Sequence, residues 1–153
     1  MTSPSERLRE LGITLPTVAA PAGSYVPARR TGSLVFTAGQ IPFVDGVPAA
    51  TGKVGADVTP EEAAGLAGIC ALNGLAAVDA LVGLDAVAGV IKVVGFVASA
   101  PGFTGQPAVL NGASNLLAQV FGEAGRHARS AVGVAELPLG VPVEVELIVE
   151  VGE

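Results

Sequence analysis

Two charged residues near the C-terminus, Arg129 and Glu144, are of the types that bind and hydrolyse small carboxylic acids. A guanidinium holds a carboxylate through two parallel hydrogen bonds, and a glutamate can orient or deprotonate a water molecule. The same two residue types also form plain cross-strand ion pairs. The residues alone leave both interpretations open.

Two strand patterns must position these side chains. Apolar residues alternate with glutamates over residues 142–151, and this period of two predicts a half-buried strand. Residues 130–134 predict a second strand, and residues 137–142 predict the turn between the two. We therefore expect a hairpin that brings Arg129 and Glu144 toward the same region.

Four other side chains are candidates for chemistry, each with a plainer interpretation. Tyr25 is the only tyrosine and lies in coil, where packing and ligand contact are equally open. Asn111, near the start of a predicted helix, is expected to cap that helix rather than bind a ligand. His127 is the only histidine, so no zinc site is expected. Cys70 lies in an apolar helical stretch and is expected to be a core residue.

Composition limits the classes of function. The 153 residues are half apolar and only 14% charged, which favours one domain that buries surface against copies of itself. The net charge of −6 argues against a nucleic-acid partner. A single cysteine fits a reducing compartment, and the polar N-terminus is not that of a signal peptide, so we expect a cytoplasmic protein.

The order of predicted elements indicates an α+β fold. After a short helix over residues 4–11 and coil over 15–27, strands are expected at 33–37 and 41–44, and Asp45-Gly46 is expected to form a hairpin turn. Helices are expected at 60–82 and 108–122, on either side of a buried central strand at 87–98. The first of these long helices should start with a capping box of Thr59 and Glu62 and end at Gly83. In the second, the expected buried residues are Val109, Leu116, Leu117 and Val120.

Two helices of this kind are expected to cover one face of the sheet. The other face is rich in valine, so other subunits should cover it. The helix at 60–82 is apolar enough to be weighed as a membrane span. Its Ala and Gly content, Asn73 and the capped start favour a helix packed on a sheet.

Several short motifs in order resemble those of the YjgF/RidA (Rid, or L-PSP) family. They lie between residues 25 and 150, which leaves residues 1–22 as an N-terminal extension of the single domain 1–153. The motifs are Thr37-Ala38-Gly39-Gln40-Ile41-Pro42, Asn111, Arg129-Ser130, Leu137-Pro138 and Glu144-Val145-Glu146. The resemblance implies a chorismate-mutase-like fold, a homotrimer around a central barrel, and clefts between subunits.

The resemblance also implies roles for individual residues. Arg129 would hold the carboxylate of a 2-imino or 2-enamine acid, and Glu144 would position the attacking water. Tyr25 would come from an adjacent subunit. The pocket would further be lined at Ala38, Gly39, Asn111 and Ala131. The archetypes carry serine at the position of Ala38 and cysteine at that of Ala131, so this chain has lost two polar side chains there.

The leading function implied is therefore hydrolysis of reactive imines to 2-keto acids and ammonia, with no cofactor and no metal. The alternative is a non-catalytic protein of the same family that binds or senses a small carboxylate metabolite. A third possibility is the ribonuclease activity of the family's older name, against which the negative charge and the single histidine weigh.

Overall fold

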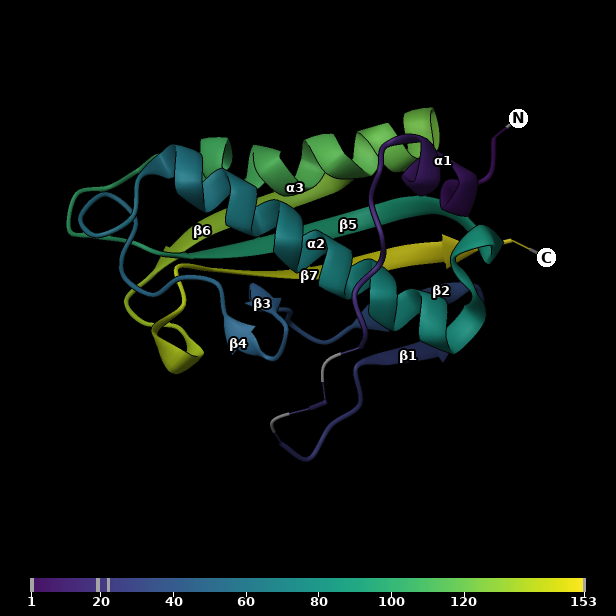
Figure 1. Ribbon diagram of the computed structural model, residues 1–153, viewed down its shortest axis with the longest axis horizontal. Helices are drawn as coiled ribbons and strands as arrows, with labels where there is room; N and C mark the ends of the chain where they lie inside the picture. The colour runs from purple at the N-terminus through teal and green to yellow at the C-terminus, as the bar shows by residue number, and fades with distance from the viewer. Residues whose placement is uncertain (1, 19, 22, 153) are drawn as a thin grey trace.

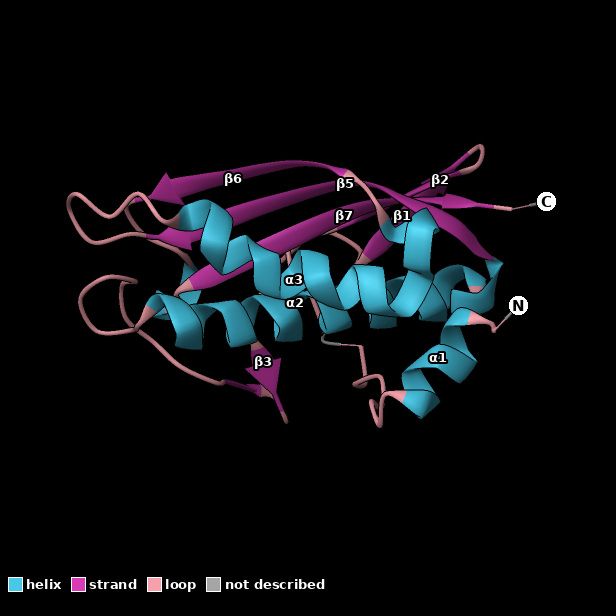
Figure 2. Cartoon of the chain, turned by 90° about the horizontal axis from the view of Figure 1, so that it is seen from above, coloured by secondary structure: helices cyan, strands magenta, loops and turns pink. Residues whose placement is uncertain are grey.

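The chain folds into a five-stranded sheet with two long helices on one face, as expected (Figure 1). The computed structural model describes residues 2–18, 20–21 and 23–152. Figure 2 shows the sheet on one side and the helices on the other. The helices are α1 Pro4–Glu10, α2 Pro60–Val82 and α3 Gln106–Phe121, with short 3₁₀ turns η1 Leu84–Ala86, η2 Gly122–Gly125 and η3 Pro138–Gly140. The strands are β1 Ala28–Thr31, β2 Leu34–Thr37, β3 Phe43–Val44, β4 Val47–Pro48, β5 Val87–Ala98, β6 Ala128–Val134 and β7 Val143–Val151.

The predicted helix ends are largely confirmed. The Thr59 side chain accepts a hydrogen bond from the Glu62 N–H at 3.1 Å, and Gly83 ends α2 at a φ of 81°. The predicted capping box of α2 is only half formed, because no hydrogen bond from the Thr59 N–H to the Glu62 side chain is found among the described residues. A complete capping box occurs in α1, between Ser3 and Glu6.

Helix α2 is buried on all sides over residues 73–78, whereas α3 packs through one side of its surface. Half of the most apolar stretch of α2 is buried inside the protein, although α2 is long and apolar enough to cross a membrane. In α3, the buried residues include Leu110 and Ala113 beside the expected Val109, Leu117 and Val120, whereas Leu116 is only partly buried, contrary to expectation. The two helices therefore cover the sheet and each other.

The sheet order is β1-β2-β7-β5-β6, and it overturns the predicted hairpin. Strand β5 lies between β6 and β7, pairing in parallel with β6 and antiparallel with β7. The register places Val93 opposite both Arg129 and Leu147, and Phe96 opposite both Val132 and Glu144. The hairpin prediction failed because a short connection between two strands favours direct pairing, but here the buried strand β5 is inserted between them.

Before α2, the chain forms two hairpins. Strand β1 pairs with β2 and was not predicted, since its polar sequence Ala-Arg-Arg-Thr lacks an apolar alternation. The small β3–β4 hairpin turns at Asp45 and Gly46, both at positive φ, as the sequence predicted.

Alternation along the strands gives the sheet two different faces. Residues such as Val145 and Leu147 of β7 are buried under the helices. The opposite face carries Glu144 and Glu146 together with apolar side chains, of which Phe36 and Val132 are more than 40% exposed. No part of the described chain covers these apolar residues, so a partner surface is expected on this face.

Candidate functional site

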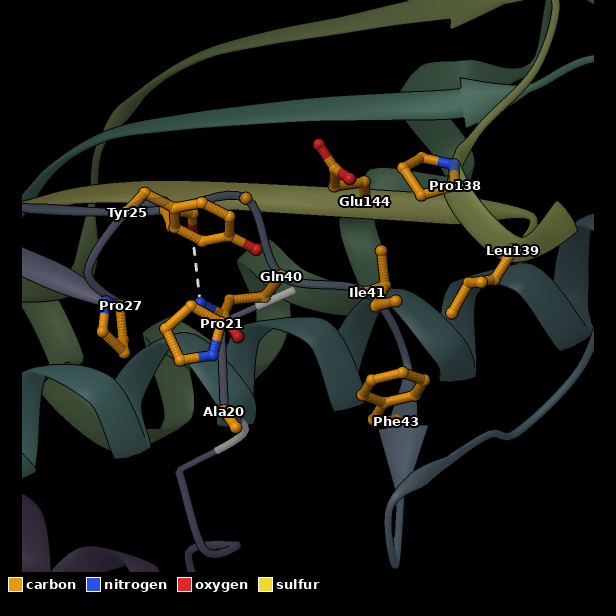
Figure 3. Close-up of a pocket in the computed structure, with 12 residues that line it drawn as sticks. Ala20, Pro21, Tyr25, Pro27, Gln40, Ile41, Phe43, Pro138, Leu139 and Glu144 are labelled. Carbon is orange, nitrogen blue, oxygen red and sulfur yellow. Dashed lines mark hydrogen bonds between the residues drawn. The ribbon is translucent and has the colours of Figure 1, made fainter. Parts of the chain in front are cut away.

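Glu144 lies in a cavity of about 230 Å³ at the start of β7 (Figure 3). The cavity is largely apolar and takes its walls from three separate segments of the chain. Its lining residues are Ala20, Pro21, Tyr25, Pro27, Ala38, Gly39, Gln40, Ile41, Phe43, Pro138, Leu139 and Glu144. The structure therefore brings together four of the predicted site residues: Glu144, Tyr25, Ala38 and Gly39.

The segment after β2 is held against β7 by backbone hydrogen bonds. The Gln40 N–H donates to the Val145 carbonyl at 2.8 Å, and the Val145 N–H donates to the Gln40 carbonyl at 2.9 Å. This bridge brings the backbone of Gly39 directly against the Glu144 carboxylate. A Cβ at position 39 would lie 2.5 Å from Oε2 of Glu144, so only glycine leaves room for the carboxylate in its present position.

Asn73 of α2 fixes the opposite wall of the cavity. Its Nδ2 donates to the carbonyls of Ile41 and Phe43 at 3.0 and 3.3 Å. Asn73 is almost fully buried, and the sequence indicated only that it is a polar residue in an apolar helix. The structure explains it as the anchor of the loop that carries Ile41 and Phe43 into the cavity.

The Glu144 carboxylate has neither a hydrogen bond nor an ion pair among the described residues. Burial raises the pKa of Glu144 above its ordinary value of 4.5, and the nearby Glu146 carboxylate raises it further. A half-buried carboxylate with a raised pKa and no paired cation among the residues that the structure describes is suited to accept a proton from a water molecule.

Arg129 lies elsewhere, on β6 beside α3. Its Nη1 donates to Asn111 Oδ1 at 2.8 Å and to Ser114 Oγ at 3.2 Å, and its Nη2 donates to the Pro107 carbonyl at 3.3 Å. These bonds use three of the five N–H groups of a guanidinium. Two remain, including Nε–H, and they suffice for a bidentate contact with a carboxylate.

Asn111 is therefore a partner of Arg129 and does not cap α3. Helix α3 starts after Gly105, and no side chain caps it. The prediction of a cap was wrong because the helix begins earlier than expected, at Gln106, which places Asn111 in its second turn.

Within one chain, Arg129 and Glu144 do not form one site. Arg129 shares the helix-covered face with Val93 and Leu147, whereas Glu144 shares the open face with Phe96, and β5 separates their strands. The described residues also form no ion pair between Arg129 and Glu144, which was the plainer interpretation of the two side chains.

The remaining candidates occupy the places that their types suggest. Ala131, on β6 with Arg129, is partly buried against the core, and Tyr25 is half exposed at the edge of the cavity. Cys70 is fully buried, and burial raises the pKa of its thiol well above the ordinary value. Among the described residues, no cluster of His, Cys, Asp and Glu could hold a metal ion.

Sequence reasoning missed two kinds of site residue. The apolar wall of Ile41, Phe43 and Leu139 carries no chemical signal, and only the fold gathers it. Ser114 was missed too, although a helical spacing of three from Asn111 places both on the same side of α3.

Comparisons with known proteins agree with this architecture. The family described as YjgF/chorismate mutase-like, putative endoribonuclease, matches residues 5–151. Protein TCP17 of Trypanosoma cruzi is 47% identical over 94% of this chain and 91% of its own length.

Two solved structures extend the likeness to three dimensions. A protein of unknown function from Agrobacterium tumefaciens is 47% identical, with a TM-score of 0.89 over 99% of this chain and 93% of that one. The E. coli protein TdcF, crystallised with bound serine, is 30% identical, with a TM-score of 0.58 over 90% of this chain and 94% of that one. With its fold and nearly its whole length matched, the chain belongs to the YjgF/chorismate mutase-like family.

Proposed function

We propose that the protein hydrolyses 2-imino acids to 2-keto acids and ammonia, in sites shared between neighbouring copies of the chain. The observation that carries the proposal is the Glu144 carboxylate, which lies in an apolar cavity without a cation or donor from the described part of its own chain. Arg129 of a neighbouring copy would supply the cation that binds the substrate carboxylate.

The positions of the two half-sites favour such an assembly. Arg129 lies on β6, which is one edge of the sheet, and the cavity of Glu144 lies toward the other side, beyond β5. A head-to-tail ring of identical chains brings one edge of each subunit to the opposite side of the next. The exposed Phe36 and Val132 on the open face are the apolar surface that such a ring would bury. We propose three subunits, as the family resemblance implies.

The chemistry follows from the two charged groups. The guanidinium of Arg129 would bind the substrate carboxylate, and the apolar walls would accept the substrate side chain. Glu144 would take a proton from water as the water oxygen bonds to the imine carbon, while the C=N electron pair moves to nitrogen. Glu144 would then return this proton to nitrogen, which leaves an amino group and a hydroxyl group on the same carbon. The Glu144 carboxylate would next take the hydroxyl proton and deliver it to the amino nitrogen as the C–N bond breaks, so that ammonia leaves and the C=O bond of the keto acid forms.

The structure of the similar E. coli protein TdcF contains bound serine, which supports an amino-acid-like ligand for this protein. The family description also mentions endoribonuclease activity. The net charge of −6 and the single histidine weigh against that activity here, because RNA binding draws on clustered basic residues.

The test is an assay in which an amino-acid oxidase generates the imine continuously. Added protein should speed the release of ammonia and 2-keto acid and should reduce the trapping of imine by semicarbazide. Glu144→Gln should lose the acceleration, while Glu146→Gln serves as the control on the same face of β7. If the protein binds a keto acid but does not accelerate hydrolysis, it is a carboxylate-binding protein and not a hydrolase. If it does neither, both functions are ruled out.

A further inference from the structure

Behind Arg129 lies a chain of hydrogen bonds that the proposed chemistry does not use. Ser114 Oγ, which accepts from Arg129 Nη1, also lies 2.9 Å from His127 Nε2. On its other side, His127 Nδ1 lies 2.7 Å from the Gly125 carbonyl. The chain thus runs from a backbone carbonyl through the only histidine and a serine to the arginine.

The partners settle where each proton lies. A backbone carbonyl only accepts, so Nδ1 of His127 must carry the proton that the Gly125 oxygen receives. In the neutral imidazole Nε2 then carries none and must accept from the Ser114 hydroxyl. With its proton directed at His127, the Ser114 oxygen keeps its lone pairs for the N–H of Arg129. Every donor in the chain meets an acceptor.

We propose that Ser114 and His127 are positioning residues for Arg129. His127 fixes the orientation of the Ser114 hydroxyl, and Ser114 together with Asn111 holds the guanidinium at Nη1. The Nε–H and the second Nη2 N–H, which make none of these hydrogen bonds, stay available to a carboxylate. This inference rests on the proposed function, because it assigns Arg129 to substrate binding.

The location of Arg129 makes such support necessary. The side chain is long, stands on an edge strand and is only partly buried, so holding it in one conformation costs entropy. A guanidinium that is already held in place loses less freedom when the ligand binds. Removing the support should therefore weaken ligand affinity more than it slows the chemical step, because neither Ser114 nor His127 touches the cavity of Glu144.

Two pairs of variants separate positioning from general folding. Ser114→Ala removes the hydroxyl, and Ser114→Thr retains it. His127→Asn keeps an amide near the place of Nδ1 but leaves the Ser114 hydroxyl without the ring nitrogen that accepts its proton, whereas His127→Gln places an amide near Nε2. Calorimetry with 2-oxobutanoate as the probe gives the affinity, and the imine assay gives KM and kcat.

Ser114→Ala and His127→Asn should each weaken 2-oxobutanoate binding about fivefold, with KM rising in parallel and kcat changing less than twofold. Ser114→Thr and His127→Gln should stay within about twofold of wild type, and all four melting temperatures should be similar. Because the protein has one histidine, ¹⁵N-labelled histidine gives one unambiguous pair of ring nitrogens by NMR. The protonated nitrogen should be Nδ1.

The outcomes distinguish this inference from the proposed function. Wild-type affinity in Ser114→Ala and His127→Asn, together with loss of binding in Arg129→Ala, would overturn the positioning role and leave the function in place. If wild type binds no 2-oxobutanoate and does not hydrolyse imine, the proposed function is wrong. The His127 tautomer measured by NMR then tests the series of hydrogen bonds independently of the function. A proton on Nε2 would then overturn the chain as well.

Discussion

The carboxylate of Glu144 occupies the space in which a side chain at position 39 would begin. A Cβ built on Gly39 would lie 2.5 Å from Oε2 and 2.9 Å from Cδ of Glu144. Gly39 thus sets the position of Glu144 through the absence of a side chain. The Gln40–Val145 bridge fixes the backbone that makes this contact possible.

Replacing Gly39 by alanine should therefore displace the Glu144 carboxylate without unfolding the protein. The new Cβ meets the end of a flexible side chain, which can rotate away, so the melting temperature should change little. A misplaced base should lower kcat/KM for imine hydrolysis about 10- to 100-fold. Gly65→Ala is the matched control, since its Cβ meets nothing within 4 Å on the exposed side of α2. Equal activity in both variants would show that Glu144 needs no fixed position.

The raised pKa of Glu144 predicts the pH dependence of hydrolysis. A general base works only when it is deprotonated, so kcat/KM should rise with pH through the pKa of Glu144. The acid limb should lie above the ordinary value of 4.5, because burial and Glu146 both oppose the charge. Glu146→Gln should shift the limb toward lower pH by removing one of these causes. A pH–rate profile of both proteins checks this, and an unmoved limb would assign it to another group.

The same pKa has a consequence for stability. The folded-state pKa of Glu144 is raised, so the folded protein binds its proton more tightly than the unfolded chain does, and stability falls as pH rises through that pKa. Glu144→Gln should therefore melt a few degrees higher than wild type near neutral pH and lose this advantage in acid, below the ordinary carboxyl pKa. Thermal melts across this pH range measure the difference. A lower melting temperature at neutral pH would mean that a cation already pairs with Glu144 in the assembly.

Shared sites predict complementation between two inactive variants. In a cyclic trimer mixed from Arg129→Ala and Glu144→Gln chains, one of the three sites combines an intact Arg129 with an intact Glu144. Random mixing in equal amounts should therefore restore about a quarter of the wild-type activity. The chains should be co-expressed, and light scattering should confirm three chains per particle. Trimers without any recovered activity would mean that both residues act within one chain.

The positions of helices and strands were predicted from the sequence more accurately than the pairing of the strands in the sheet. The alternation in β7 and the caps of α2 are local signals, and both elements appeared where expected. The pairing of β6 with β5 instead of β7 depends on how strands distant in sequence assemble, which no local pattern contains. For this reason Arg129 and Glu144, which were expected at one hairpin, lie on strands separated by β5, and the register places them on opposite faces of the sheet.

The candidate site residues likewise divide into those with a local sequence signal and those whose role depends on the three-dimensional fold. Glu144, Gly39 and Tyr25 were named as candidates through their types and motifs, and the fold gathers them around one cavity. Asn73 and Ser114 act through hydrogen bonds to groups far away along the chain, so their roles were visible only in three dimensions.

Substitutions of Arg129 test the carboxylate contact most directly. Lysine cannot reproduce the planar fork of a guanidinium, so Arg129→Lys and Arg129→Ala should both lose most of the imine hydrolysis and about 2–5 kcal/mol of binding free energy for a 2-keto acid. The free energy of unfolding should change by only about 1 kcal/mol, because Arg129 is partly exposed and two of its three hydrogen bonds, to Asn111 and Pro107, lie at the surface.

Calorimetry with 2-oxobutanoate, together with thermal melts of each variant, separates the two effects. The matched control is Arg30→Ala, which removes an exposed arginine of β1 whose Nε donates to the Gly32 carbonyl and which lines neither half of the proposed site. Arg30→Ala should bind the keto acid like wild type. Since no ion pair joins Arg129 to Glu144 within the described chain, a loss of affinity at an unchanged melting temperature would reflect the ligand contact itself. Wild-type affinity in Arg129→Ala would remove Arg129 from the site and with it the main reason to place the substrate carboxylate there.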